Sequence, residues 1–286
     1  MPIPESILGS WSHHYSATAS KQAHSLIRNA LANYKAWAKD TKYKVFLQGS
    51  YKNDTNLRRD SDVDLVIQLI EELPTQVAKF TSIQLENNQD HKIAYGRWKS
   101  FRKQVLNAMR AAFGVETVTP GRKSLKLTKG KIPAAADVVV TLQYENSITF
   151  YLPDERRWVV SYPQQHHTKG LKKERVTDGR YKRTIRMFKA VRNHLVEGNV
   201  IKSKTAPSYF IECLLYNVPN GFFRPSLSQS YSGIVEYLKT AKLQQFRCQN
   251  GVRELFGPSR DLWNMDEAKQ FIRVLGRLWD NWPRDS

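Results

Sequence analysis

Two short segments restrict the fold of this chain more than any other part of the sequence. They are Gln48-Gly-Ser-Tyr-Lys52 and Ser61-Asp-Val-Asp-Leu-Val-Ile67. The second has the apolar pattern of a β-strand, with two aspartates one residue apart. Side chains two residues apart on a strand point to the same face. We therefore expect Asp62 and Asp64 to project together, while the apolar residues between and after them face the other way.

The pair of aspartates and the preceding glycine also predict a chemistry. Two carboxylates fixed side by side repel each other, so the arrangement is costly without a cation. Mg²⁺ satisfies both, because it takes oxygen ligands and keeps positions for water and substrate phosphates. Gly49 permits a sharp turn after a predicted strand at residues 45–47, so that backbone N–H groups and the Ser50 hydroxyl can approach a phosphate. A lone Asp-x-Asp pair is more often a solvated strand edge or a turn.

A third carboxylate strengthens the metal hypothesis. The segment Ala134–Leu142 is rich in β-branched residues, predicts a buried central strand, and carries one charge, Asp137. A carboxylate in such a strand needs a partner. Beside the strand of Asp62 and Asp64, it would complete a set of ligands for two Mg²⁺ ions about 3.5–4 Å apart, for which Mn²⁺ could substitute. The alternative is an aspartate that caps a loop at the end of the strand.

Composition agrees with a phosphate-binding protein. The 45 Lys and Arg residues exceed the 26 Asp and Glu residues, giving a formal charge of +19 that attracts polyphosphates or nucleic acid without distinguishing them. The two cysteines, Cys213 and Cys248, are far apart and do not predict a zinc site or a disulfide framework. The histidine pairs 13–14 and 166–167 are expected at the surface. Without a span-length apolar segment or a signal peptide pattern, we expect no membrane association and a cytoplasmic location.

The order of predicted elements indicates a mixed α/β fold with two domains. Amphipathic helices are predicted at residues 18–38 and 95–113, and short strands at residues 115–118, 124–127, 135–142, 149–152 and 158–161. Residues 71–92 predict a long polar connection, and residues 163–182, which lack apolar periodicity, a linker. We assign residues 1–165 to an α/β palm with the N-terminal helix packed across it, and residues 166–286 to a helical substrate-binding domain.

The helical part contains a second group of candidate residues. A predicted helix at residues 181–196 has an apolar stripe on one side and Lys182, Arg186, Lys189 and Asn193 on the other. Such a basic stripe is often only a solvated face. In the next predicted helix, Pro207 suits the first turn and places Ser208 where free N–H groups favour an anion. Lys189 and Ser208 could together hold the β- and γ-phosphates of a nucleoside triphosphate.

These residues together resemble the catalytic layout of the polymerase-β-type nucleotidyltransferases. Within that group, the chain is similar to the bacterial cGAS/DncV-like nucleotidyltransferases (CD-NTases), and most similar to their E clade. The segments that carry the resemblance span nearly the whole chain: Leu47-Gln-Gly-Ser-Tyr-Lys-Asn53, Ser61-Asp-Val-Asp-Leu-Val-Ile67, Trp158-Val-Val-Ser-Tyr-Pro163, Ala206-Pro-Ser-Tyr-Phe-Ile-Glu-Cys213 and Phe246-Arg-Cys-Gln-Asn-Gly251. The zinc-binding insertion of the animal relatives that sense DNA has no counterpart here, so a nucleic-acid activator is not indicated.

The resemblance implies a monomeric enzyme that joins two or three nucleoside triphosphates without a template into a cyclic oligonucleotide, a second messenger that acts on an effector in anti-phage (CBASS) signalling. It implies that Asp62, Asp64 and Asp137 bind the metal ions. The same resemblance implies that Gly49, Ser50, Lys189 and Ser208 contact phosphates, and it makes Gln48 and Arg186 additional nucleotide-binding candidates.

Base choice depends on one position of this layout. E-clade members that use uridine resemble one another in carrying Asn where this chain has Ser161, whereas Ser is associated with purines. A serine hydroxyl cannot copy the paired donor and acceptor of an amide. We therefore expect a purine-containing cyclic dinucleotide made from ATP, GTP or both, with UTP as the alternative. Otherwise Ser161 is a strand residue that contacts no base.

Two other functions are considered. One is an RNA-end nucleotidyltransferase. The other is a non-catalytic nucleic-acid-binding protein, and the costly carboxylate cluster argues against this second alternative.

Overall fold

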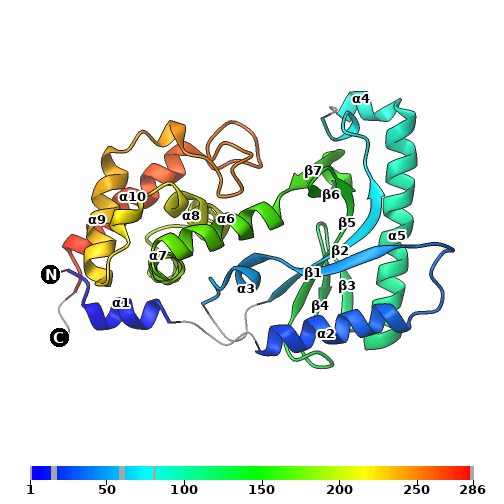
Figure 1. Ribbon diagram of the computed structural model, residues 1–286, viewed down its shortest axis with the longest axis horizontal. Helices are drawn as coiled ribbons and strands as arrows, with labels where there is room; N and C mark the ends of the chain where they lie inside the picture. Colours follow the sequence, from blue (N-terminus) through cyan, green and yellow to red (C-terminus); the bar gives the residue numbers. More distant parts are fainter. Residues whose placement is uncertain (1, 14–17, 58–61, 80–81, 284–286) are drawn as a thin grey trace. The chain divides into compact units, whose positions relative to one another are not determined.

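The chain is divided into two units, each with its own hydrophobic core, in a computed structural model that describes residues 2–13, 18–57, 62–79 and 82–283 (Figure 1). The sheet unit contains residues 18–52 and 62–164 of this range, and the helical unit contains residues 2–13, 53–57 and 165–283. Residues 2–13 and 53–57 fall inside the predicted palm range of 1–165, yet they pack with the helical unit. His14 and Ser61, which figured in the sequence predictions, lie outside the described residues.

The sheet unit is built on one mixed sheet of seven described strands. Their order is β1-β2-β5-β4-β3, with β6 paired to β5 and β7 paired to β6. The pair β2–β5 is parallel and the other pairs are antiparallel. The bounds are β1 Tyr43–Leu47, β2 Val63–Glu72, β3 Val118–Pro120, β4 Leu125–Leu127, β5 Ala136–Tyr144, β6 Ser147–Leu152 and β7 Arg157–Ser161. The expectation of a mixed α/β fold is confirmed.

Two helices cover one face of this sheet, α2 (Thr18–Asn33) and α5 (Gln89–Phe113). Figure 1 shows both packed against the strands on the same side. Their apolar stripes form a core with alternate residues of β2 and β5: Ala23, Ile27, Leu31, Val63, Leu65, Ile67, Phe101, Val105, Met109, Val138 and Val140. The predicted helical periodicity is confirmed, and the opposite face of β2 and β5 stays free of these helices.

A second, aromatic core lies at the other end of α5, where Trp98 and Trp158 pack around Tyr151. Each indole nitrogen donates a hydrogen bond, Trp98 to the Val140 carbonyl at 2.9 Å and Trp158 to His91 at 3.1 Å. The polar connection predicted at residues 71–92 is shorter than expected. The strand β2 runs to Glu72, and a 3₁₀ turn at Val77–Lys79 and the short helix α4 (Ser82–Glu86) precede α5.

The helical unit has six described α-helices around one core. They are α1 Glu5–Trp11, α6 Pro163–Val176, α7 Arg180–Glu197, α8 Ser208–Tyr216, α9 Leu227–Thr240 and α10 Met265–Asp280. The centre is the predicted apolar stripe of α7, formed by Ile185, Phe188, Val191 and Leu195, all buried. Asn264 caps α10, because its side chain accepts hydrogen bonds from the backbone of Asp266 and Glu267.

The linker predicted at residues 163–182 is wrong, because α6 and the start of α7 occupy it. Apolar periodicity did not predict this helix because its buried side carries no large apolar residue: it consists of His166, Gly170 and Lys173, which recur at helical spacing. Gln249 donates to the His166 carbonyl at 2.7 Å, and the Lys173 ammonium donates to the Val218 carbonyl at 2.7 Å. Burial lowers the pKa of Lys173 to about 8. Hydrogen bonds therefore replace the apolar contacts that a periodicity search detects.

None of the helices within the described residues combines the length and the apolar character needed to cross a membrane.

Candidate active site

The face of the sheet opposite α2 and α5 carries the predicted carboxylates. Asp64 on β2 and Asp137 on β5 are directly opposite each other in the parallel register. Neighbouring strands lie about 4.8 Å apart, and paired residues project to the same face. Asp62 is exposed and immediately precedes β2, two residues before Asp64. Val63, between them, is fully buried against the helices. Asp64 and Asp137 thus lie side by side on this face, each the second residue of its strand.

Two residues that were not among the predicted site residues lie next to Asp137. The Ser124 hydroxyl donates to Asp137 Oδ1 at 3.0 Å and fixes the orientation of that carboxylate. Lys126 on β4 is directly opposite Asp137, so its exposed side chain emerges on the same face. The sequence contains one signal for these two residues. Polar and apolar residues alternate over residues 124–127, which places the serine and the lysine on one side of the strand and two leucines on the other.

The predicted phosphate turn lies against the same carboxylates. Gly49 has φ +68°, and a Cβ added there would overlap the carboxylate of Asp64, coming within 2.9 Å of its Cγ. The Gln48 N–H donates to the Asp64 carbonyl at 2.9 Å. Only glycine therefore lets the backbone pass this close to the aspartate. Ser50 follows at the start of α3 (Gly49–Asn53), half-buried, one residue from this contact.

The donor set fits a magnesium ion in its chemistry. Carboxylate oxygens are the ligands that Mg²⁺ prefers, and Asp64 and Asp137 stand as neighbours on rigid strands. In the described part of the chain, no three His, Cys, Asp or Glu side chains converge closely enough to enclose a metal ion. The assignment of two metal ions to Asp62, Asp64 and Asp137 therefore stays a prediction.

The helical unit contains a buried charge network built around Glu212 on α8. Its carboxylate accepts hydrogen bonds from the Lys189 ammonium at 2.5 Å, the Thr55 hydroxyl at 2.7 Å and His166 Nε2 at 2.8 Å. Lys189 is 2% exposed and Glu212 is 4% exposed. The Lys189 ammonium also donates to the Thr55 carbonyl at 3.2 Å. The segment after α3 is thus tied into the helical unit by α7 and α8.

This pairing shifts the ionisation of Glu212. Burial alone would raise the pKa of the Glu212 carboxyl, but the charge of Lys189 and the hydrogen bond from His166 outweigh burial and hold this pKa below its usual range. The carboxylate is therefore ionised. His166, expected at the surface, is buried because it is part of this network. His167 lies within 3.2 Å of Asn53 in the same unit.

The predicted basic stripe of α7 is buried, so its interpretation as a solvated face is wrong. Lys182 forms an ion pair with Asp54 at 2.7 Å, and Arg186 donates to the Asp54 carbonyl at 2.6 Å and to the Ser12 carbonyl at 2.8 Å. Burial lowers the pKa of Arg186. These cations hold the segment 53–57 and the N-terminal segment onto the helical core. Contacts of Lys189 and Arg186 with a nucleotide stay predictions.

The remaining predicted site residues are separate from this network. The Ser208 hydroxyl accepts a hydrogen bond from Arg192 at 2.9 Å, and within the described residues no hydrogen bond joins it to Lys189. Ser161 is the last residue of β7, half-buried and opposite Ile148 of β6. Roles of Ser208 in phosphate binding and of Ser161 in base choice stay predictions.

Comparisons with known proteins identify relatives over the full length of the chain. Residues 168–280 match the family model of the cGAS/DncV-like nucleotidyltransferase C-terminal helical domain. The chain is 41% identical to a cyclic UMP-AMP synthase from Rhodothermus marinus over 99% of both chains. It is 32% identical to the cyclic nucleotide synthase CdnE01 of Staphylococcus haemolyticus over 99% of this chain and 100% of the relative. The solved structure of Rhodothermus marinus CdnE c-UMP-AMP synthase with Apcpp and Upnpp superposes with a TM-score of 0.85 at 40% identity, covering 100% of this chain and 99% of that one.

Proposed function

Because this chain belongs to the E clade of the cGAS/DncV-like nucleotidyltransferases, we propose that it is a template-independent synthase that joins two nucleoside triphosphates into a cyclic dinucleotide and releases pyrophosphate. A three-nucleotide ring is the larger alternative. The observation that carries the proposal is the pair of opposed carboxylates, Asp64 and Asp137, with the glycine turn of Gly49 against them. The names of the relatives support cyclisation as the outcome.

The residues of the sheet unit account for the chemistry of one step. The backbone at Gly49 and the Ser50 hydroxyl would receive the phosphates, because the left-handed backbone of Gly49 brings this turn against the Asp64 carboxylate. A ribose hydroxyl would lie beside Asp137, whose carboxylate is oriented by Ser124, and would attack the α-phosphorus in line with the departing pyrophosphate. Asp62, Asp64 and Asp137 would hold two Mg²⁺ ions, which neutralise phosphate charge when bound. One site can serve both bond-forming steps if the linear intermediate rebinds.

Two observations bear on which bases the product contains, and they favour different products. Ser161 favours a purine-containing product from ATP or GTP, because a hydroxyl lacks the paired donor and acceptor of an amide. The second candidate is a uridine-containing product, favoured by the 41% identity to a cyclic UMP-AMP synthase. In either case we propose that the product acts in the bacterial cytoplasm as a second messenger in anti-phage signalling, through a separate effector.

A primer-free labelling experiment tests the proposal. The protein is incubated with Mg²⁺ and four radiolabelled nucleoside triphosphates, with and without an RNA primer, and then treated with phosphatase. We expect a small phosphatase-resistant product that needs no primer. Label found only on extended RNA would overturn cyclisation and favour an RNA-end nucleotidyltransferase.

Matched variants connect the product to the proposed site. Asp62→Ala and Asp64→Ala should abolish turnover and leave the fold intact, because removal of a carboxylate relieves repulsion in the metal-free protein. Asp90→Ala serves as the control, since Asp90 is an exposed aspartate of the same unit, in the first turn of α5, which covers the opposite face of the sheet. Full activity in either of the first two variants would refute the metal site.

A further inference from the structure

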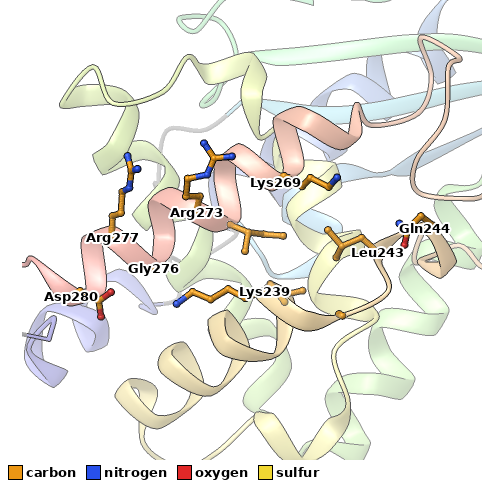
Figure 2. Close-up of a pocket in the computed structure, with 11 residues that line it drawn as sticks. Lys239, Leu243, Gln244, Lys269, Arg273, Gly276, Arg277 and Asp280 are labelled. Carbon is orange, nitrogen blue, oxygen red and sulfur yellow. The ribbon is translucent and has the colours of Figure 1, made fainter.

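A pocket of about 490 Å³ lies between α9 and α10, within the helical unit and lined by none of the residues proposed for catalysis (Figure 2). Small-molecule sites commonly have volumes of about 300–1,000 Å³. The segment from Ala241 to Gln244, which follows α9, completes its lining. All of these elements belong to one unit, so the pocket does not depend on how the two units are placed.

The floor of the pocket is aliphatic. Leu238, Leu243 and Ile272 are buried side chains that continue the core of the helical unit. Gly276 leaves room on α10 for the stem of Lys239, because an added Cβ would stand 3.0 Å from its Cε. The pocket therefore presents an apolar surface on which the uncharged body of a ligand can lose its contact with water.

The rim of the pocket is cationic. Lys269, Arg273 and Arg277 are spaced four residues apart on α10, so successive side chains emerge on one side about 6 Å apart along the axis. Figure 2 shows the two arginines extending side by side, and Lys239 of α9 reaching toward Asp280. The lining contains one carboxylate, that of Asp280, and Lys239 is paired with Glu236 outside the lining at 2.6 Å, which leaves the three cations of α10.

The cations of α10 stand without an ion pair among the described residues. Across the part of the chain that the structure describes, Lys269, Arg273 and Arg277 form no ion pair with a carboxylate. Like charges four residues apart on a helix destabilise it by about 0.2–0.5 kcal/mol per pair. Three of them in a row, at the edge of a pocket and without an acidic partner, are a cost to the helix that an anionic ligand would remove.

The chemistry of the lining restricts the ligand. Guanidinium groups match phosphate oxygens in a bidentate geometry, and two arginines one turn apart suit a ligand with two or more negative charges. Single-stranded nucleic acid is bound largely by stacking on aromatic side chains, and none lines this pocket. We propose that the pocket between α9 and α10 binds a small organic phosphate, whose charged end lies among the rim cations and whose apolar or planar body lies on the aliphatic floor.

Titration calorimetry on the full chain tests this site. It is done in EDTA, so that no divalent ion supports nucleotide binding by the carboxylates of the sheet unit. The probes are ATP, phenyl phosphate, inorganic pyrophosphate and a six-nucleotide RNA. The pocket variant is Arg273→Gln with Arg277→Gln. The control is Arg224→Gln with Arg260→Gln, which removes the same charge from exposed arginines outside the lining. Thermal melting verifies the fold, and Lys269→Gln replaces the pocket variant if that variant fails to fold.

We expect the pocket variant to bind ATP or phenyl phosphate about tenfold more weakly than the parent, and the control to bind like the parent. Pyrophosphate should bind more weakly than the organic phosphates, because it has no uncharged part that can contact the aliphatic floor of the pocket. Preference for ATP would identify nucleotides as the source of the ligand, and preference for phenyl phosphate a non-nucleotide phosphate. The proposal would be overturned if neither ATP nor phenyl phosphate binds the parent, if the pocket variant binds both as tightly as the parent does, or if the variant loses affinity for the RNA alone. These outcomes do not depend on which product the enzyme makes.

Discussion

The buried ion pair of Lys189 and Glu212 predicts a large, specific loss of stability for Glu212→Gln. The substitution keeps the shape of the side chain but removes the charge that balances the Lys189 ammonium, which is only 2% exposed. Removing one partner of a buried pair costs about 3–5 kcal/mol, because the other charge stays buried without compensation. The Thr55 and His166 hydrogen bonds to the same carboxylate make relaxation of the site difficult. We expect the free energy of unfolding of the helical unit to fall by this amount.

Urea denaturation and hydrogen exchange of the full chain measure the loss. The amides of α7 and α8 should lose protection together with those of residues 53–57, because the network joins them. Glu236→Gln is the control, since Glu236 pairs with Lys239 at the surface, where an ion pair contributes about 0–1 kcal/mol. Lys189→Met combined with Glu212→Leu should recover at least half of the loss, because no buried charge remains. A loss below about 1 kcal/mol for Glu212→Gln would refute the reasoning.

The same network predicts a dependence of stability on acid. Because the pKa of Glu212 is held below its usual range in the folded protein, its contribution is complete above the unfolded pKa of about 4.5. This contribution is lost as the pH falls below that value, through the folded pKa. The stability difference between the parent and Glu212→Gln should therefore shrink in acid. A difference that stays constant from neutral pH to below pH 4 would contradict the assigned ionisation.

Three further predictions address single residues. Gly49→Ala should abolish turnover, because its Cβ would displace the Asp64 carboxylate. Gly179→Ala is the control, since Gly179 has φ +77° and a Cβ there would stand 4.0 Å from the nearest atom, Glu174 Oε1; it should show only the backbone cost of about 1–2 kcal/mol and keep activity. Equal activity of the two variants would contradict the contact with Asp64. Burial lowers the pKa of Lys173 from 10.5 to about 8, so the folded state releases its proton first as the pH rises. Stability should therefore rise between these pH values by about 3 kcal/mol relative to Lys173→Met, as measured by urea denaturation, and parallel pH profiles of the two proteins would refute this. Ser161→Asn should raise uridine incorporation in a labelled-product assay, and an unchanged product would remove Ser161 from the base pocket.

The sheet unit could be predicted largely from local sequence patterns. The alternation around Asp62 and Asp64 assigns them to one face of a strand, and the β-branched run around Asp137 predicts a central strand. Local patterns alone do not place these two strands side by side. That prediction also depends on the assumption that the carboxylates of both strands bind the same ligand. The structure pairs Asp64 with Asp137 directly. The alternation over residues 124–127 places Ser124 on the polar side of its strand, but its hydrogen bond to Asp137 also depends on the register of β4 and β5, which that pattern does not specify.

The helical unit was harder to predict because long-range polar contacts build it. Lys189 was interpreted from its position on a helix, whereas its environment is set by Glu212, on the next helix, and by Thr55, far away in the sequence. The helix α6 buries His166 and Lys173 instead of apolar side chains, so periodicity did not reveal it. The pocket between α9 and α10 illustrates the same limit, because a local pattern can indicate each helix but not the pairing that forms the pocket.

The mass of the phosphatase-resistant product tests the central claim most directly. The purified protein is incubated with Mg²⁺ and all four nucleoside triphosphates, and the treated product is analysed by mass spectrometry. A cyclic dinucleotide has two nucleosides, two phosphates and no terminal phosphate, and this is the composition that we predict, with at least one purine base. Products that all carry a 5′-terminal phosphate before treatment and are degraded by phosphatase to dinucleoside monophosphates would contradict cyclisation.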